Sequence, residues 1–283
     1  MLTPAQQAQY QADGYLVLPD FKTAAEIQAL RERALQIVEA FDADRHRAIF
    51  STQDQARKTT NTAFLDSAEG IECFFEEEAF DEQGRLKQAK ALSINKIGHA
   101  MHDLDPVFSA FSRGPGLAAL AADLGLAQPQ LWQSMYIFKQ PGIGGEVTWH
   151  QDASFFDTTP STVTAFWFAL EDATQDNGCL WVQPGGHRGP LRERFVRYAS
   201  ANGDAVRMDK LDNTPWPTMA TAVPVPVKAG TLVCFHGLLP HWSAPNRSAA
   251  SRHAYTLHAT DASAHYAEHN WLRRSAGRPV RGF

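Results

Sequence analysis

The chain has 283 residues, of which 44% are hydrophobic and 20% charged, and its formal net charge is −5. This length and composition are those of a globular protein with a full hydrophobic core. The acidic balance argues against nucleic acid as the main partner. No apolar run reaches the length of a membrane span, the first residues lack a signal-peptide pattern, and the three cysteines include no Cys-x-x-Cys pair. We therefore expect a cytoplasmic protein that binds neither nucleic acid nor membrane; its oligomeric state cannot be read from the composition.

The N-terminal part of the chain carries helix signals. Thr3, which precedes a proline, predicts the start of a helix, and Gly14 predicts its end. The apolar run 15–18 predicts a short strand. Thr23 and Glu26 form a capping-box pattern, and apolar residues then recur on one helical face. The positions on that face are Ile27, Leu30, Ala34, Ile37, Val38 and Phe41.

Residues 42–92 are polar and weakly periodic. For Phe74–Glu78, where acidic and aromatic side chains mix, we expect a solvated helix with its aromatic side chains tucked in; a substrate lid is the alternative. The run Ser93–Gly98 predicts a strand in which Lys96 leans toward the interior. Helix signals over 104–126 are interrupted by a Gly-Pro-Gly sequence.

Short strand-like runs separated by turn signals follow from about residue 129, which predicts a β sandwich or barrel. The runs cover 131–138, 147–149, 163–170, 179–182, 223–227, 231–235 and 252–260. Pro224 and Pro226 place their run at the edge of a sheet. We predict one domain, 1–283, made of a helix-rich flank over 1–128, a β core over 129–262 and a basic tail over 263–283. We expect that tail to be a solvated end.

The stretch that carries chemistry contains His150 and Asp152. Two residues apart on extended chain, their side chains point to the same face and suit a divalent first-row metal. A third ligand must come from elsewhere in the chain: His241, after a proline, is the candidate, and His187, in a glycine-rich loop, is its rival. Two histidines and one carboxylate form the ligand set of non-heme Fe(II) oxygenases.

Arg252 is the candidate anchor for an anionic cosubstrate. A guanidinium binds a carboxylate through two parallel hydrogen bonds, and a buried arginine needs an anion. The alternative for Arg252 is a surface salt bridge. The sequence contains no Gly-x-Ser-x-Gly elbow, no phosphate loop and no Gly-x-Gly-x-x-Gly motif, so other common catalytic sites are not indicated.

These motifs together resemble those of the phytanoyl-CoA dioxygenase family of Fe(II)/2-oxoglutarate-dependent oxygenases, particularly the branch called phytanoyl-CoA dioxygenase domain-containing proteins. The segments that carry the resemblance span most of the chain in the family's order. They are Asp13–Leu18, Trp149–Ser154, Asp176–Leu180, Pro184–His187 and Leu239–Ser243 with Arg252. That branch usually has Pro-Gly-Ser-His where this chain has Pro184–His187, which is a mild departure.

The resemblance implies a mostly β fold with flanking helices: a double-stranded β-helix, or cupin-like jelly roll, with the N-terminal helices packed on one face. It implies His150, Asp152 and His241 as the iron ligands. The residues that it implies around 2-oxoglutarate are Arg252, Ser243, Lys96, Met135, Gln151 and Trp167. The presence of Asp152 favours oxygenation over halogenation, because related halogenases lack this carboxylate and place chloride there.

The expected function is that of a dioxygenase that uses Fe(II), 2-oxoglutarate and O2 to hydroxylate a small organic or acyl substrate, with release of succinate and CO2. Two alternatives stay open. One is a protein of the same fold that binds metal and 2-oxoglutarate without efficient turnover of an external substrate. The other is a hydrolase or isomerase that uses the same triad with zinc or manganese, and it does not need Arg252 as an anchor.

Overall fold

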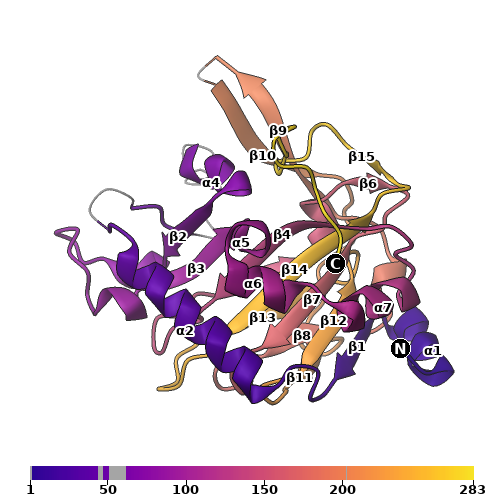
Figure 1. Cartoon of the computed structure of the whole chain (residues 1–283), viewed down its shortest axis with the longest axis horizontal. Coiled ribbons are helices and arrows are strands. Elements are labelled where there is room, and N and C mark those ends of the chain that lie inside the picture. Colours follow the sequence, from indigo (N-terminus) through magenta and orange to yellow (C-terminus); the bar gives the residue numbers. More distant parts are fainter. Residues whose placement is uncertain (1, 44–46, 51–61, 202) are drawn as a thin grey trace.

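A large antiparallel sheet forms the centre of the fold (Figure 1). The structure is a computed structural model and describes residues 2–43, 47–50, 62–201 and 203–283. The strands of this sheet are, in spatial order, β1 (Tyr15–Leu18), β12 (Leu232–His236), β7 (Thr164–Ala169), β14 (Ala254–Asp261), β4 (Pro129–Ile137), β3 (Ile94–His99) and β2 (Ile71–Phe75). Neighbours in the list pair antiparallel.

A smaller antiparallel sheet packs against the large one. Its strands are, in spatial order, β11 (Val223–Val225), β8 (Leu180–Val182), β13 (His241–Ser243) and β5 (Val147–His150). Apolar side chains from both sheets form one buried cluster between them, which includes Trp167 and Phe235 from the large sheet and Val182 from the small one. This arrangement is the predicted jelly roll. Strand β11 lies at a sheet edge, as its prolines predict.

Strand β7 explains why the run 163–170 is apolar at nearly every position. Side chains on a strand point alternately to its two faces. Ala165 and Trp167 pack between the two sheets, whereas Phe166 and Phe168 pack toward the helices on the other side. Because both faces are covered, both sets of positions must be apolar.

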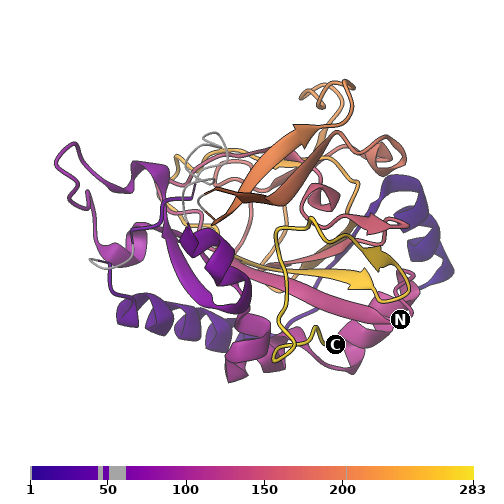
Figure 2. The same ribbon diagram turned by 90° about the horizontal axis from the view of Figure 1, so that it is seen from above.

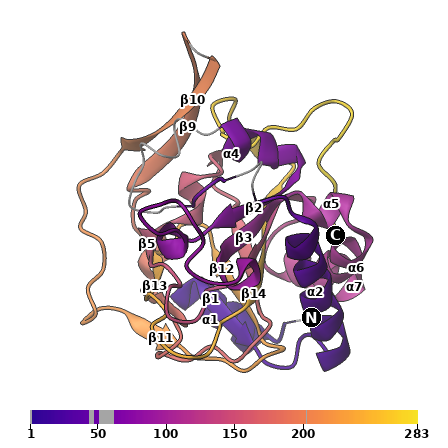
Figure 3. The same cartoon turned by 90° about the vertical axis from the view of Figure 1, so that its left-hand side faces the viewer.

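Helices α2 (Ala24–Ala40), α5 (Met101–Leu104), α6 (Pro106–Ser112) and α7 (Pro115–Asp123) cover the outer face of the large sheet, opposite the small sheet (Figure 3). Figure 2 shows α2, in indigo and purple, on the side of the molecule away from the orange hairpin of β9 (Glu193–Ser200) and β10 (Gly203–Lys210). Further helices are α1 (Pro4–Asp13) and α4 (Thr62–Asp66). Short 3-10 helices are η1 (Ser67–Glu69), η2 (Glu77–Ala79), η3 (Lys90–Leu92), η4 (Asp152–Ser154) and η5 (Gly186–Arg188).

The helix signals at the N-terminus are confirmed. Thr3 and Thr23 each accept a hydrogen bond from the third helical residue and complete a capping box. Gly14 ends α1 in the left-handed region at φ 81°, where glycine carries no penalty from a Cβ atom. Ile27 and Leu30 of α2 are buried against the sheet, as the periodicity predicts.

Three parts of the chain differ from expectation. Phe74 and Phe75 belong to strand β2 and not to a solvated helix, because the sheet extends over them and buries both. The hairpin of β9 (Glu193–Ser200) and β10 (Gly203–Lys210), which projects at the top of Figure 1, was not anticipated. The alternative of a substrate lid within 42–92 falls in part on 44–46 and 51–61, which lie outside the described residues.

The C-terminal tail is a solvated end only in part: residues 270–272 are buried, whereas most of 273–281, with three of its four arginines, is exposed. Strand β15 (His265–Tyr266) pairs with β6 (Thr158–Thr159), and the chain then folds back over the molecule. Trp271 is 1% exposed and packs in a cluster with Phe64, Phe74 and Phe195. Burial of apolar surface beneath Trp271 holds this part of the tail against the rest of the molecule.

No helix in the described part of the chain is both long and apolar enough to cross a membrane.

Candidate active site

His150, Asp152 and His241 come together at one end of the small sheet. His241, the first residue of β13, pairs directly opposite His150, the last residue of β5. Gln151 is extended, at φ −124° and ψ 132°, so Asp152 returns to the same face as His150. Oδ1 of Asp152 lies 3.6 Å from Nε2 of His150 and 3.7 Å from Nε2 of His241. One potential ligand atom from each residue lies within 4.8 Å of the others.

Hydrogen bonds to the backbone fix the tautomer of both histidines. Nδ1 of His150 lies 2.8 Å from the Thr148 carbonyl oxygen, and Nδ1 of His241 lies 3.0 Å from the Leu239 carbonyl oxygen. A carbonyl only accepts, so each Nδ1 must carry the proton and donate it. Each Nε2 is therefore left with a lone pair directed toward the Asp152 carboxylate, which is the arrangement that a metal-ligating histidine needs.

The electrostatics of the triad keep these groups in their ligating forms. Burial, and next the neighbouring His241, lower the pKa of His150 to about 3, so its imidazole is neutral. Burial acts to raise the pKa of Asp152, but His258 and His241 outweigh it, and the pKa is held well below its usual range. A neutral imidazole and an ionised carboxylate are the forms that bind a divalent metal.

Arg252 is buried in the same cavity with part of its guanidinium unpaired. It is 1% exposed, and its Nε donates to the Gly178 carbonyl at 3.0 Å. Nη2 lies 3.4 Å from Oγ of Ser243, whereas Nη1 has no hydrogen-bond partner among the described residues. Burial lowers the pKa of Arg252 to about 10, which still leaves it charged at neutral pH. Because Arg252 is buried, the alternative of a surface salt bridge is wrong. A buried cation with a free N–H needs an anion.

Strand register carries several predicted pocket residues to the cavity. Thr256 of β14 pairs with Met135 of β4 on one side and with Trp167 of β7 on the other, so the three side chains form a row on one face of the sheet. All three line the cavity, as does Lys96 from β3, which is 5% exposed and lies over the ring of Phe50. The structure thus gathers Lys96, Met135 and Trp167 around one space, as predicted.

Gln151 is the predicted site residue that the structure does not bring to the cavity. Its Nε2 donates to the carbonyls of Pro190, at 3.0 Å, and Leu238, at 2.8 Å, and its Oε1 accepts from the backbone N–H of Arg192 at 3.0 Å. Between two residues that face the metal site, the alternation of an extended chain turns Gln151 the other way. Its amide ties neighbouring loops together, and contact with a cosubstrate is not supported.

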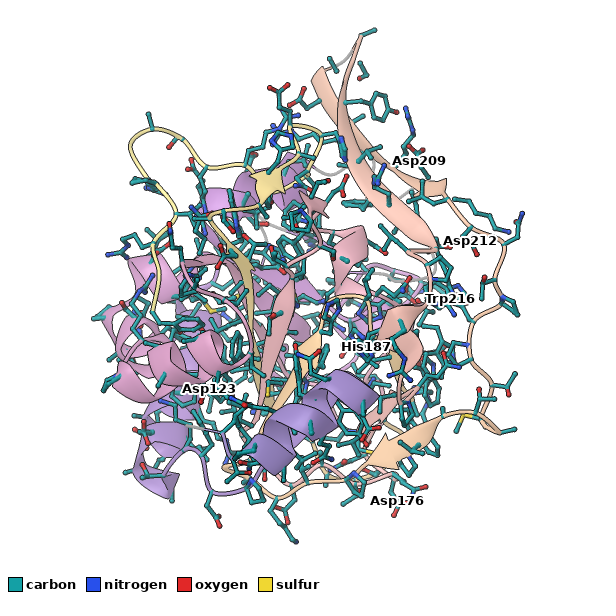
Figure 4. All side chains as sticks on the ribbon, turned by 90° about the vertical axis from the view of Figure 1, so that its right-hand side faces the viewer. Asp123, Asp176, His187, Asp209, Asp212 and Trp216 are labelled. Atoms are coloured by element: carbon teal, nitrogen blue, oxygen red, sulfur yellow. The ribbon has the colours of Figure 1, made fainter. Side chains whose placement is uncertain are left out.

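His187 is also remote from the triad. Its ring lies 5.4 Å from that of His236 and packs directly on Gly14, where an added Cβ would lie 2.3 Å from Nδ1 of His187. Figure 4 shows His187 beside α1, on the outer side of the molecule. His187 does not line the cavity. His241 is therefore the third member of the triad.

Two cavity residues, Thr256 and His258, were missed by reading the sequence. Both are 5% exposed, and both follow Arg252 at even spacings along β14. Side chains alternate between the two faces of a strand, so residues at even spacings from Arg252 face the same side. Once Arg252 is assigned to the cavity, this spacing predicts that Thr256 and His258 face it as well.

A buried ionic cluster closes the Arg252 end of the cavity. Nζ of Lys139 donates to the Gly145 carbonyl at 2.6 Å, and Oε2 of Glu76 accepts from Asn95 at 2.7 Å and from the Gly145 N–H at 3.1 Å. Burial and the nearby Arg252 lower the pKa of Lys139, and burial raises the pKa of Glu76. Both shifts disfavour the charged forms of Lys139 and Glu76, so Arg252 supplies the positive charge at this end of the cavity and its neighbours add fixed polar groups.

The cavity, of about 190 Å³, has a different wall on its other side. This wall is largely aromatic and joins four separate parts of the chain: α4, the segment around η4, the β9–β10 hairpin and the tail. Its residues are Phe64, Phe155, Phe156, Phe195, Met208 and Trp271. Phe64 and Trp271 stack with their ring centroids 4.5 Å apart. Such a wall excludes water and favours an apolar ligand.

The residues present fit a divalent metal and a carboxylate-bearing cosubstrate. Two Nε2 lone pairs and one carboxylate oxygen converge, and a buried guanidinium in the same cavity has an N–H without a partner. Fold and site together define a class, a jelly-roll protein of the oxygenase type with a candidate centre for non-heme metal.

The comparisons with known proteins agree. Residues 10–254 match the sequence model of the family described as "Phytanoyl-CoA dioxygenase (PhyH)". The chain is 47% identical over 279 residues to "Phytanoyl-CoA dioxygenase 1" of Oryza sativa subsp. japonica, covering 96% of this chain and 94% of that protein. It is 43% identical over 278 residues to "Phytanoyl-CoA dioxygenase domain-containing protein 1" of Bos taurus, covering 96% and 95%. The chain belongs to the phytanoyl-CoA dioxygenase family.

Solved structures share the fold at lower sequence identity. The non-heme alpha ketoglutarate dependent carbocyclase SnoK from nogalamycin biosynthesis is similar with a TM-score of 0.66 and 19% identity, over 100% of this chain and 94% of that one. EctD from S. alaskensis with 2-oxoglutarate and 5-hydroxyectoine is similar with a TM-score of 0.62 and 21% identity, over 98% and 82%. The first of these neighbours is thus described as alpha ketoglutarate dependent, the second was solved with 2-oxoglutarate, and this chain shares their fold.

Proposed function

We propose that the chain is a non-heme Fe(II)/2-oxoglutarate-dependent dioxygenase that hydroxylates a small organic or acyl substrate and releases succinate and CO2. The observation that carries this proposal is the pairing of two features in one cavity. One is the triad of His150, Asp152 and His241, and the other is Arg252, whose unpaired N–H suits the far carboxylate of 2-oxoglutarate. A hydrolase or isomerase that used the same triad would have no need for that buried cation.

Each part of the site has a defined task in this proposal. His150, Asp152 and His241 would hold the iron, and the backbone carbonyls of Thr148 and Leu239 keep the two imidazoles oriented toward it. When bound, iron and 2-oxoglutarate supply the oxidising chemistry with O2. Arg252 and Ser243 orient the cosubstrate, and a guanidinium held in advance by Gly178 needs little reorganisation when the cosubstrate binds.

The aromatic wall supports an organic substrate with a substantial apolar part. Phe64, Phe195 and Trp271 line the cavity on the side of the β9–β10 hairpin and the tail, away from the ionic cluster around Lys139. An apolar group placed there gains by losing contact with water. Excluding water from the cavity also protects reactive species from side reactions.

The test is succinate formation without an added substrate. Protein loaded anaerobically with Fe(II) is given 2-oxoglutarate, ascorbate and O2, and succinate is measured against time. We expect slow succinate formation that Asp152→Ala abolishes. Asp157→Ala is the matched control, because Asp157 is a nearby carboxylate bound to Arg194 at 3.0 Å and to His269 at 2.8 Å and lies outside the cavity. Succinate at the Asp152→Ala level in protein shown to hold iron would instead favour the binding protein without turnover.

A further inference from the structure

His258 faces the one oxygen of Asp152 that the other two histidines leave free. Its Nε2 lies 3.3 Å from Oδ2 of Asp152, whereas His150 and His241 both approach Oδ1. Oδ2 has no aligned hydrogen-bond partner among the described residues, and Nδ1 of His258 has none either. Because a carboxylate only accepts, Nε2 of His258 can serve Oδ2 as a donor when that nitrogen carries the proton. The two oxygens of Asp152 thus have different neighbours.

The fold holds the His258 ring in this position. The ring stacks on Phe156, with centroids 5.2 Å apart and planes 22° apart, and Phe156 is itself 1% exposed. The register of β14 against β4 shifts between His258 and Ala259. Irregularities of this kind redirect a side chain and are frequent beside active sites. His258 also lies beyond residues 10–254, the part of the chain matched by the family's sequence model.

This geometry affects whether Asp152 would bind a metal through one carboxylate oxygen or through both. A carboxylate can bind through one oxygen or through both, and binding through both fills a coordination position that a bidentate cosubstrate or O2 needs. A donor on Oδ2 disfavours the second mode, because Oδ2 would lose that donor on turning toward the metal. Partners of this kind orient metal ligands in many sites.

We propose that His258 is a positioning residue that holds Oδ2 of Asp152, so that Asp152 offers only Oδ1 to the metal and leaves room for the cosubstrate. This inference rests on the proposed function, since it assumes that the triad binds metal. It requires no contact between His258 and the metal, the cosubstrate or the substrate.

The experiment compares two replacements of His258 in the full chain. His258→Phe keeps a ring to stack on Phe156 but has no N–H, whereas His258→Gln loses the ring but places an amide N–H near the former Nε2. His102→Phe is the matched control, because His102 is also buried, is bonded to Ser134 and lies outside the cavity. Should His258→Phe fail to fold, His258→Met, which also lacks a donor, takes its place.

The readouts use Mn(II) in place of iron and require no turnover. At saturating Mn(II), calorimetry gives the affinity for 2-oxoglutarate, and water-proton relaxation before its addition reports the exchangeable waters that the metal keeps. We expect His258→Phe to weaken 2-oxoglutarate binding by about tenfold to a hundredfold and to lower the relaxation enhancement. His258→Gln should restore both to within about threefold of the wild type, a difference below 1 kcal/mol. His102→Phe should affect only thermal stability.

The outcomes separate the inference from the function on which it rests. Wild-type protein that binds neither Mn(II) nor 2-oxoglutarate would overturn both. If the wild type binds them and His258→Phe binds them equally well, only the positioning role is lost. The same conclusion follows if His258→Gln is as impaired as His258→Phe, because the donor would then not be what matters.

Discussion

Replacing Arg252 by methionine separates the cosubstrate site from the metal site. Methionine approximates the length and volume of the arginine stem but carries no charge. The substitution leaves the Gly178 carbonyl satisfied, because Oγ of Ser243 also donates to it, at 2.9 Å. The protein should therefore fold, and the main loss should be the N–H groups available to 2-oxoglutarate.

The size of the loss follows from the unpaired atom. Nη1 of Arg252 has no partner among the described residues, so it can make at least one new charge-assisted hydrogen bond to a carboxylate. Such a bond is worth about 1.5–3 kcal/mol, which corresponds to roughly tenfold to 150-fold in affinity. Nη2, held only at 3.4 Å by Ser243, can add to this if it turns to the ligand. We expect at least a tenfold loss, and Arg252→Lys should recover only part of it.

The assay is an anaerobic calorimetric titration of 2-oxoglutarate into Fe(II)-loaded protein. Iron affinity should be unchanged, because Arg252 is not a ligand. Without cosubstrate the variant should melt no lower than the wild type, since an unpaired buried charge has been removed, but a given concentration of 2-oxoglutarate should raise its melting temperature less than that of the wild type. Arg247→Met is the control: Arg247 precedes the same strand, and its side chain is 55% exposed. Unchanged affinity for 2-oxoglutarate in Arg252→Met would refute the assignment of the anchor.

Three further outcomes are expected. His241→Ala should abolish retention of Fe(II) through desalting, whereas His187→Ala should not; equal retention in both variants would remove His241 from the site. Thr23→Ala should lower the free energy of unfolding by about 0.5–2 kcal/mol in urea denaturation, because the capping box of α2 is lost; an unchanged midpoint would show that the cap contributes nothing. Burial, and next His187, lower the pKa of His236 to about 4. A histidine in the unfolded chain titrates near 6.5, so as the pH falls the unfolded state is protonated before the folded state. Stability present above pH 6.5 should therefore decline toward pH 4, and His236→Gln should make the melting temperature less dependent on pH over that range.

Much of the candidate site could be predicted because its signals are local. His150 and Asp152 share a face through one extended residue between them, and this needs no knowledge of the rest of the fold. The helix caps at Thr3 and Thr23 are likewise set within one turn of chain. The family resemblance extended this reading to His241 and Arg252, which lie far from His150 in sequence.

The hairpin 193–210 and the buried part of the tail were not anticipated, for different reasons. The hairpin carries a local signal that was overlooked, the Asn-Gly dipeptide at 202–203, which favours a tight hairpin turn, but its strands are half exposed and show only weak apolar alternation. The tail is basic, yet Trp271 is buried, because it packs against apolar side chains from distant parts of the chain. The composition of a short segment does not show whether distant parts of the chain will bury it.

The sequence by itself selected His150 and Asp152 as a pair of metal-type side chains on one face, because their spacing and chemistry suffice for that, and the same alternation turns Gln151 between them the other way. Only the tertiary structure decided between His241 and His187 and brought His258 to Asp152. These outcomes depend on which strands are neighbours and in what register they pair. A shift of one residue in a strand would exchange its inward and outward side chains, and register is set by the packing of the whole sheet, which no short stretch of sequence contains.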